Sequence, residues 1–149
     1  MNEGDKTMID YQPINSEDLK PMIYDIFKQQ RLEYVGESQA RNEDIISIGA
    51  YKDKQLVGGI IAHQQFQTLE IDYLAIQKGF RNLKIGSQLL EHVELLAQEK
   101  DIITITLNTL EYQAGAFYER HGYTQFAQLE DVPRLGDVRA YYYKRMADQ

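Results

Sequence analysis

Residues 69–90, LEIDYLAIQKGFRNLKIGSQLL, contain a change of hydrophobic period that decides the fold. In the first part apolar and acidic side chains alternate, which is typical of a β-strand with one buried face, and we expect this strand at residues 67–76. The alternating residues are Leu69, Ile71 and Tyr73 on the apolar side and Glu70 and Asp72 on the acidic side. The sequence therefore predicts a half-buried strand that leads into a glycine-containing loop.

The second part of this stretch has the period of a helix. From residue 85 onward the apolar side chains fall on one helical face. They are Ile85, Leu89, Leu90, Val93, Leu96 and Ala97. Asp101 ends the pattern, and the apolar, β-branched run at 102–107 is typical of a buried strand that can pair in parallel with its neighbour. We therefore expect a strand–helix–strand unit.

The loop between this strand and helix, residues 78–87, has the composition of a phosphate-binding turn. A helix N-terminus presents unpaired backbone N–H groups and the positive end of the helix dipole. Arg81 and Lys84 add positive charge, Gly86 permits close approach of a ligand, and Ser87 adds a hydroxyl donor. A simple connecting loop is the alternative, because one glycine with two cations is not a specific signal.

The rest of the chain completes an α/β fold, which some schemes class as α+β. We expect a mixed, mostly antiparallel sheet flanked by helices, in the order β-α-β-β-β-α-β-α-β-β. The expected strands are 8–13, 45–51, 56–63, 67–76, 102–107, 123–129 and 138–146, and the other helices begin near residues 16 and 111. Gly58 and Gly59 indicate a bulge or a close backbone approach. Residues 8–147 form one expected domain, preceded by a disordered tail at 1–7.

The first helix has a clear start signal. Asn15 or Ser16 can cap it, and two acidic residues follow in its first turn, where they favour the helix dipole. Its apolar face combines Leu19, Met22, Ile23, Ile26 and Phe27. The polar segment 29–42 that follows allows two interpretations, an extension of the helix or a loop.

Composition excludes several classes of protein. No apolar run reaches the roughly 18 residues of a membrane helix, and no signal-peptide core is present, so we expect a cytoplasmic protein without membrane contact. The chain has no cysteine, and its three histidines lack metal-ligand spacing, so we expect neither disulfides nor a metal. A net charge of −7 argues against nucleic-acid binding and suits a cationic partner such as an amine.

Residues 69–90 resemble the acetyl-coenzyme-A motif of the GNAT superfamily of N-acetyltransferases. In that motif a strand ending in Leu-x-Val/Ile continues through Arg/Gln-x-x-Gly-x-Gly/Ala into a helix. The matching residues are Leu74, Ile76, Arg81 and Gly86. The chain departs from the motif at Lys84, where the family usually has a glycine, but a lysine keeps the backbone N–H that the family uses.

A second stretch, residues 113–123, resembles the family's Ala-x-x-Phe-Tyr-x-x-x-Gly-Phe/Tyr helix. Gly122 stands at the position expected to end this helix. The family often has an asparagine three residues before the matched alanine; this chain has Glu111 there, and Asn108 could serve instead. The two blocks follow one another in the family's order, and the resemblance covers about residues 44–146.

The resemblance implies that the chain moves an acetyl group from acetyl-coenzyme A, its co-substrate, to a primary amine by direct nucleophilic attack. The cofactor-binding residues that it implies are Leu74, Ala75, Ile76, Arg81, Asn82, Leu83, Lys84, Ile85, Gly86, Ser87 and Asn108. The acceptor is expected to be a small-molecule or peptide amine, bound by the first helix, its following loop and the last hairpin. A coenzyme-A-binding regulatory or interaction module without turnover is the alternative, and the oligomeric state stays open, a homodimer included.

The resemblance also implies how protons move. Tyr118 matches a tyrosine that commonly lies near the coenzyme sulfur; a phenol with a pKa of about 10 is neutral at pH 7 and can protonate the departing thiolate. The alternative for Tyr118 is a core aromatic residue. Because the family splays its central strand, a backbone N–H near Ile76 can face the thioester carbonyl.

The base that takes the proton from the amine is less narrowly defined. Glu70 falls where the histone acetyltransferase branch has its glutamate base. Asp72 shares its strand face and is a rival, many relatives use a water chain, and both carboxylates could simply be solvated. Glu33 and Glu37 could equally hold a cationic amine.

Overall fold

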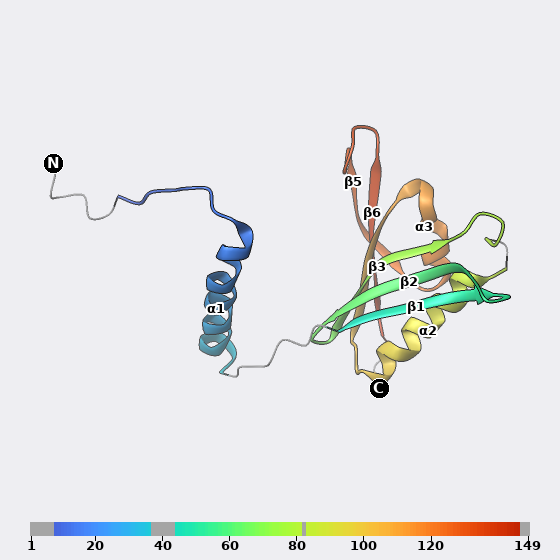
Figure 1. Cartoon of the computed structure of the whole chain (residues 1–149), viewed down its shortest axis with the longest axis horizontal. Coiled ribbons are helices and arrows are strands. Elements are labelled where there is room, and N and C mark those ends of the chain that lie inside the picture. Colours follow the sequence, from blue (N-terminus) through green and yellow to red (C-terminus); the bar gives the residue numbers. More distant parts are fainter. Residues whose placement is uncertain (1–7, 37–43, 82, 147–149) are drawn as a thin grey trace. The chain divides into compact units, whose positions relative to one another are not determined.

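The computed structural model describes residues 8–36, 44–81 and 83–146 of the 149-residue chain. Two compact units make up the chain, Met1–Ala40 and Arg41–Gln149. The first unit carries the helix α1, and the second carries the sheet and the helices α2 and α3 (Figure 1).

Helix α1 spans Ser16–Val35 and begins as the sequence predicts. The Asn15 side chain accepts a hydrogen bond of 2.9 Å from the Glu17 N–H, which caps the first turn. At the other end Gly36, with φ 78°, donates its N–H to the Leu32 carbonyl at 2.9 Å. The helix thus extends into the polar segment that allowed two interpretations, and the rest of that segment lies outside the described residues.

The predicted first strand at 8–13 is wrong. Residues 8–15 have no regular secondary structure, and Met8, Ile9 and Tyr11 are exposed. A strand forms only by pairing with a neighbour, and the sheet order β1-β2-β3-β4-β6-β5 includes no strand from this segment. A short run of apolar residues such as 8–13 is therefore not enough to predict a strand, because a strand also needs a neighbouring strand to pair with.

The other expected elements are present, and the α/β fold class is confirmed. The strands are β1 (Ile45–Lys52), β2 (Gln55–Gln65), β3 (Thr68–Ile76), β4 (Thr104–Leu110), β5 (Thr124–Glu130) and β6 (Val138–Arg145). The helices of this unit are α2 (Ile85–Glu99) and α3 (Glu111–Arg120). Among the strands that the structure describes, β3 and β4 are the one parallel pair, which is the predicted strand–helix–strand unit, and the other pairs are antiparallel.

Two local features shape the β2–β3 ladder. A Cβ on Gly58 would lie 2.8 Å from the Ile76 side chain and 3.0 Å from the Ala75 carbonyl oxygen, so the predicted close backbone approach is confirmed. The ladder also skips one residue, because Ile61 pairs with Tyr73 while the next residue of β2 pairs with Ile71. Asp72 is therefore the extra residue of a β-bulge.

The bulge corrects the expected pattern of β3. Leu69 and Ile71 are buried as predicted, but Tyr73 is 69% exposed. Inserting one extra residue reverses the side-chain alternation, so that Leu74, rather than Tyr73, packs against the core.

The two helices of this unit share one hydrophobic core with the sheet. Helix α2 contacts β1, β2 and β3, and α3 contacts β4, β5 and β6. Leu90 and Val93 of α2, Tyr118 of α3 and Tyr142 of β6 all belong to this core cluster. The core therefore fixes the start of α2 and the inner face of α3 on either side of the β3–β4 pair.

Candidate active site

The parallel strands β3 and β4 separate before they end. Their register runs from Thr68, opposite Thr104, to Ile71, opposite Leu107, and β3 then continues to Ile76 without a partner on this side. The Gln77 N–H donates to the Val57 carbonyl of β2 at 2.8 Å. Because backbone groups alternate in direction along a strand, the N–H groups of Ile76 and Leu74 point away from β2, into the gap.

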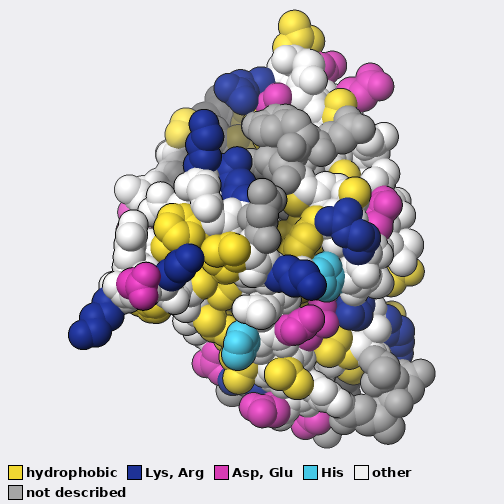
Figure 2. Space-filling view, turned by 90° about the vertical axis from the view of Figure 1, so that its right-hand side faces the viewer, with side chains coloured by type: hydrophobic (Ala, Val, Ile, Leu, Met, Phe, Trp, Pro, Cys, Tyr) yellow, Lys and Arg dark blue, Asp and Glu magenta, His cyan; other side chains and the backbone are white. Residues whose placement is uncertain are grey.

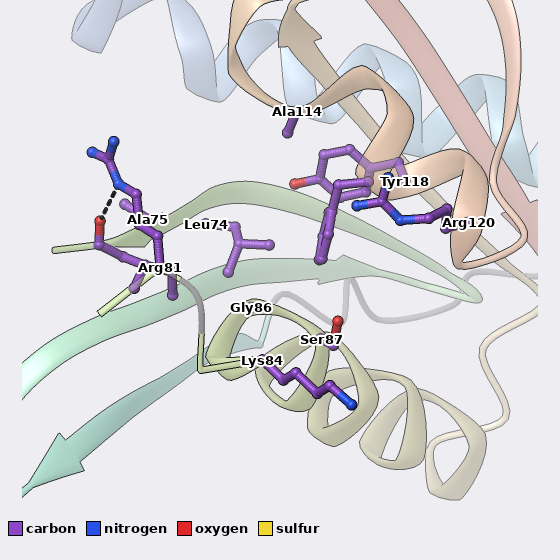
Figure 3. Close-up of a pocket in the computed structure, with 11 residues that line it drawn as sticks. Leu74, Ala75, Arg81, Lys84, Gly86, Ser87, Ala114, Tyr118 and Arg120 are labelled. Carbon is purple, nitrogen blue, oxygen red and sulfur yellow. Dashed lines mark hydrogen bonds between the residues drawn. The ribbon is translucent and has the colours of Figure 1, made fainter. Parts of the chain in front are cut away.

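A pocket of about 700 Å³ lies at this gap. Its lining residues come from the end of β3, the following loop, the start of α2, and α3: Leu74, Ala75, Ile76, Arg81, Lys84, Gly86, Ser87, Ala114, Phe117, Tyr118 and Arg120. Figure 3 shows these side chains around a common space. This volume is in the range of small-molecule and cofactor sites.

The start of α2 forms one wall of the pocket. Lys84 has φ 59° and ψ 21°, the left-handed conformation that a glycine adopts easily, so the lysine takes the backbone shape of the residue it replaces. The N-cap residue Lys84 makes no side-chain capping hydrogen bond, and the first turn of α2 has no acidic residue. The N–H groups of Ile85, Gly86 and Ser87 thus have no partner within the helix and are available to an anion.

Three cations line the pocket of a chain whose net charge is −7. Arg81 donates from Nε to the Ile76 carbonyl oxygen at 3.3 Å, which ties the loop to the end of β3 (Figure 3). Lys84 comes from the start of α2, and Arg120 from the end of α3. Seen from the side of α3 and the β3–α2 loop, basic side chains border a hydrophobic area (Figure 2). This arrangement favours a ligand with both phosphate groups and an apolar arm.

Tyr118 has a polar hydroxyl on a ring that packs among other aromatic rings. Its ring lies 5.1 Å from that of Phe117, 5.7 Å from Tyr123 and 6.0 Å from Tyr142, measured between ring centroids. Only 5% of the residue is exposed, and burial raises the pKa of Tyr118 to about 12. In Figure 3 its hydroxyl lies on the side of Leu74 and Ala75. Tyr118 is therefore a neutral donor at any ordinary pH.

Ser87 has a partner that the sequence did not suggest. Its Oγ lies 2.9 Å from Nε2 of His121, the residue that follows α3. The predicted end of α3 is also confirmed: Gly122 has φ 86°, and the Tyr123 N–H donates to the Tyr118 carbonyl at 3.0 Å. The fold thus joins the start of α2 to the end of α3 at the pocket.

Glu70 does not line the pocket but belongs to a cluster on neighbouring strands. His63 of β2 pairs with Glu70 across the ladder, and their side chains approach to 3.5 Å between Nε2 and Oε2. The His63 Nδ1 lies 2.8 Å and 2.9 Å from the two Asp72 oxygens. Both carboxylates thus meet one imidazole, and the histidine of the neighbouring strand is the member of this cluster that the pattern of β3 alone does not reveal.

Several predicted cofactor residues do not present their side chains to the pocket. Leu83 is 49% exposed and Ile85 packs against the core, and neither side chain lines the pocket. Asn108 accepts a hydrogen bond from Arg139 of β6 instead. Asn82 lies outside the described residues.

Three lining residues were not assigned to the site from the sequence, namely Ala114, Phe117 and Arg120. A helical signal could have found them. Phe117 and Arg120 stand three residues apart and so share a side of α3, next to Tyr118. Phe117 also covers Gly86, since a Cβ added there would meet its ring at 3.5 Å.

Across the described ranges 8–36, 44–81 and 83–146, no helix combines the length and the apolarity needed to cross a membrane. The fold and the pocket define an α/β domain that presents a helix N-terminus and cations to an anionic ligand. Residues 43–125 match the family model of the acetyltransferase (GNAT) domain. The chain belongs to the GNAT family.

Individual relatives agree with this membership. The chain is 36% identical over 80 residues to a blasticidin-S acetyltransferase of Streptomyces morookaense, a match covering 53% of this chain and 59% of that protein. The chain thus spans little more than half the length of this curated relative. An acetyltransferase structure from Bacillus cereus ATCC 14579 has a TM-score of 0.81 at 25% identity, covering 94% of this chain and 99% of that one. A structure of a putative acetyltransferase from Agrobacterium tumefaciens shares the fold, with a TM-score of 0.71 at 21% identity, covering 93% and 99%.

Proposed function

We propose that this protein is an N-acetyltransferase that moves the acetyl group of acetyl-coenzyme A onto a primary amine. The observation that carries the proposal is the pocket itself, where a helix N-terminus with unpaired N–H groups, three cations and Tyr118 meet at the gap between β3 and β4. The pocket fits the co-substrate because phosphates match its cations and its volume of about 700 Å³ admits an extended arm. Acetyl-coenzyme A supplies an activated thioester.

In this proposal both backbone N–H groups and charged side chains bind the co-substrate. The N–H groups of Ile85, Gly86 and Ser87 hold the pyrophosphate, and Arg81, Lys84 and Arg120 neutralise its charge. The N–H groups of Leu74 and Ile76, which point into the gap, donate to the thioester oxygen as it becomes negative. Preorganised donors of this kind are worth about 3 kcal/mol each in enzymes that stabilise an oxyanion.

Tyr118 is proposed as the proton donor to the departing thiolate. With a pKa of about 12, its proton transfer to a thiolate whose conjugate acid has a pKa of about 8.5 is uphill by about 5 kcal/mol. That is well below the barrier of about 16 kcal/mol that corresponds to a turnover of about 10 s⁻¹. The phenol can therefore donate as the C–S bond breaks and recover its proton from solvent afterwards.

The base is proposed to be Glu70, within the cluster that His63 joins to Asp72. Asp72 precedes Ala75, a lining residue of the pocket, by three positions, or about 10 Å along the strand. The amine proton therefore reaches the cluster through water, so a water chain and a carboxylate base are parts of one route.

The acceptor is proposed to be a small-molecule amine. The relative that is 36% identical carries the name of blasticidin-S acetyltransferase, which supports a small acceptor over a protein lysine. The chain's charge of −7 also favours a cationic amine. The cytoplasm remains our expectation for its compartment, and the oligomeric state stays open, a homodimer included.

The test is the release of free thiol from acetyl-coenzyme A in the presence of amines. We expect turnover with at least one member of a panel that contains blasticidin S, aminoglycosides, polyamines and short peptides. Tight coenzyme-A binding without thiol release across the panel would instead indicate the alternative, a regulatory or interaction module. Turnover with peptides alone would move the acceptor to the protein class.

A further inference from the structure

Ser87 and His121 form a polar contact at the wall of the pocket. Ser87 lies in the first turn of α2 and lines the pocket, and His121 follows the last residue of α3. Their Oγ and Nε2 atoms are 2.9 Å apart, although 34 positions separate them in sequence. The contact therefore depends on the packing of two helices and not on a local turn.

The position of His121 is fixed from several elements. Its ring lies 4.8 Å from that of Phe117, measured between centroids. Its backbone carbonyl accepts a hydrogen bond of 3.0 Å from Lys144 of β6, and the same Nζ lies 3.1 Å from Glu94 of α2. The charged groups around it are thus Lys144, Glu94 and the neighbouring Arg120. Held in this way, the imidazole meets the Ser87 hydroxyl with Nε2.

A serine hydroxyl has one proton, so its partner decides what it presents to the pocket. When Nε2 of His121 is unprotonated, it accepts that proton, and Ser87 presents only lone pairs, which repel a phosphate. When Nε2 carries a proton, it donates to Oγ, and the hydroxyl proton is free to point into the pocket. A phosphate at the start of α2 stabilises the second arrangement.

We infer that His121 is a positioning residue of the co-substrate site: by donating from Nε2 to Ser87, it directs the Ser87 hydroxyl to the pyrophosphate of coenzyme A. The inference rests on the proposed function, since it needs a pyrophosphate at α2. It adds a residue that does not touch the ligand but sets the direction of one that does.

The experiment measures the dissociation constant of coenzyme A with the full chain by calorimetry. We expect Ser87→Ala to weaken binding about 10-fold or more, the effect of one hydrogen bond to a charged group. His121→Ala should weaken binding by a smaller but measurable factor, because the hydroxyl is still present and has lost only its orienting partner. The double variant should bind no more weakly than Ser87→Ala, because His121 acts only through the Ser87 hydroxyl. His121→Gln should stay within about twofold of wild type, because its amide N–H can take the place of Nε2–H.

Two controls separate this role from a structural one. His92, exposed on α2, gives the matched variant His92→Ala, which should leave affinity unchanged. Dephospho-coenzyme A keeps the pyrophosphate but lacks the 3′-phosphate, so the losses should be equal with both ligands. A loss seen only with coenzyme A would overturn the assignment to the pyrophosphate.

The remaining outcomes also decide. If wild type binds coenzyme A and His121→Ala binds equally well, the inference fails while the proposed function stands. Additive losses in the double variant would overturn it too. A wild-type chain that binds no coenzyme A would overturn the proposed function and the inference together. Should His121→Ala unfold, Ser87→Ala and His121→Gln still give opposite expected results, and equal affinities for these two would contradict the inference.

Discussion

Tyr118 combines an observed packing role with a proposed role as proton donor, and only its hydroxyl oxygen distinguishes the two. Replacement by Phe keeps the ring contacts with Phe117, Tyr123 and Tyr142 but removes the hydroxyl. We expect Tyr118→Phe to lower kcat by about 10²-fold, with little change in coenzyme-A affinity, because proton donation acts on the reaction step alone. Steady-state kinetics and calorimetry check the two halves. Activity within about twofold of wild type would leave Tyr118 with its packing role only.

Substitutions in the cluster of His63, Glu70 and Asp72 can identify the base. We expect Glu70→Gln to lower kcat/KM about 10²-fold at neutral pH. Raising the pH should recover part of the loss, because more of the free amine is then already deprotonated. Asp72→Asn should have a smaller effect if Glu70 takes the proton, since an asparagine keeps a polar contact with His63. The pH profile of kcat/KM is the measurement.

Other outcomes of this comparison would move the role. Recovery at high pH in Asp72→Asn but not in Glu70→Gln would assign the base to Asp72. His63→Gln tests the role of the imidazole apart from that of the two carboxylates, because glutamine keeps a polar side chain but cannot take up a proton. Wild-type profiles in all three variants would exclude the cluster, and the proton would then pass to solvent.

Among the elements, the start of α2 shows how backbone shape can outweigh side-chain identity. A lysine in the left-handed region costs about 1–2 kcal/mol relative to glycine, yet Lys84 adopts φ 59°. In the proposed co-substrate site its positive charge helps to neutralise the pyrophosphate, which gives a reason for a strained residue here. The motif therefore survives the loss of a glycine because the backbone, and not the side chain, defines it.

Gly86 tests the same element. A Cβ at this position would lie 3.5 Å from the Phe117 ring, an ordinary contact, so Gly86→Ala should fold and bind coenzyme A within a few-fold of wild type. Gly86→Glu should abolish detectable binding, because the longer side chain fills the pocket and its charge repels phosphate. Calorimetry measures both, and thermal melts confirm folding. Unchanged affinity in Gly86→Glu would remove the start of α2 from the co-substrate site.

The strands show where sequence patterns suffice and where they fail. The period change after Ile76 placed β3, α2 and β4 correctly, because each buries an apolar face that its own residues define. The pattern misplaced Tyr73, since a bulge depends on how β2 and β3 pair and leaves no signal in one strand. The segment 8–13 failed for a related reason, as a strand needs a partner from elsewhere in the chain.

The site was predictable to a similar degree. Residues of the β3–α2 loop follow from a contiguous motif, which fixes their order along a helix N-terminus. Arg120, His121 and His63 come from other elements, and only the packing of α3 on the sheet or the pairing of β2 with β3 brings them near the predicted residues. Contacts between distant segments carry no mark in a single sequence.

On the scale of the whole molecule, the charge of the residues at the pocket is opposite in sign to the net charge of the chain. The chain carries −7 overall, yet Arg81, Lys84 and Arg120 converge on one pocket. A negative net charge attracts the proposed cationic acceptor, while the three cations are proposed to hold the anionic co-substrate, so the two substrates would be drawn to different places. Because both attractions are screened by salt, each substrate's apparent affinity is tied to ionic strength.

Stability at high pH is a property of the whole fold that its buried tyrosines determine. Burial raises the pKa of Tyr118 from about 10 to about 12, and raises that of Tyr123 further, with the Glu94 carboxylate adding to the effect. The unfolded chain therefore loses these protons more readily. The stabilisation is fully present below pH about 10 and is lost as the pH rises towards 12.

We expect the free energy of unfolding to fall by about 1.4 kcal/mol for each of these two phenols between pH 9 and pH 11, where the unfolded phenol is about nine-tenths ionised. Urea titrations at the two pH values measure the loss. Tyr118→Phe should lose about 1.4 kcal/mol less than wild type over this interval, because phenylalanine has no proton to release. Tyr51→Phe, at a residue that is 69% exposed, is the control and should match wild type. An identical pH dependence in Tyr118→Phe and wild type would mean that the Tyr118 hydroxyl ionises as easily in the folded protein as in the unfolded chain.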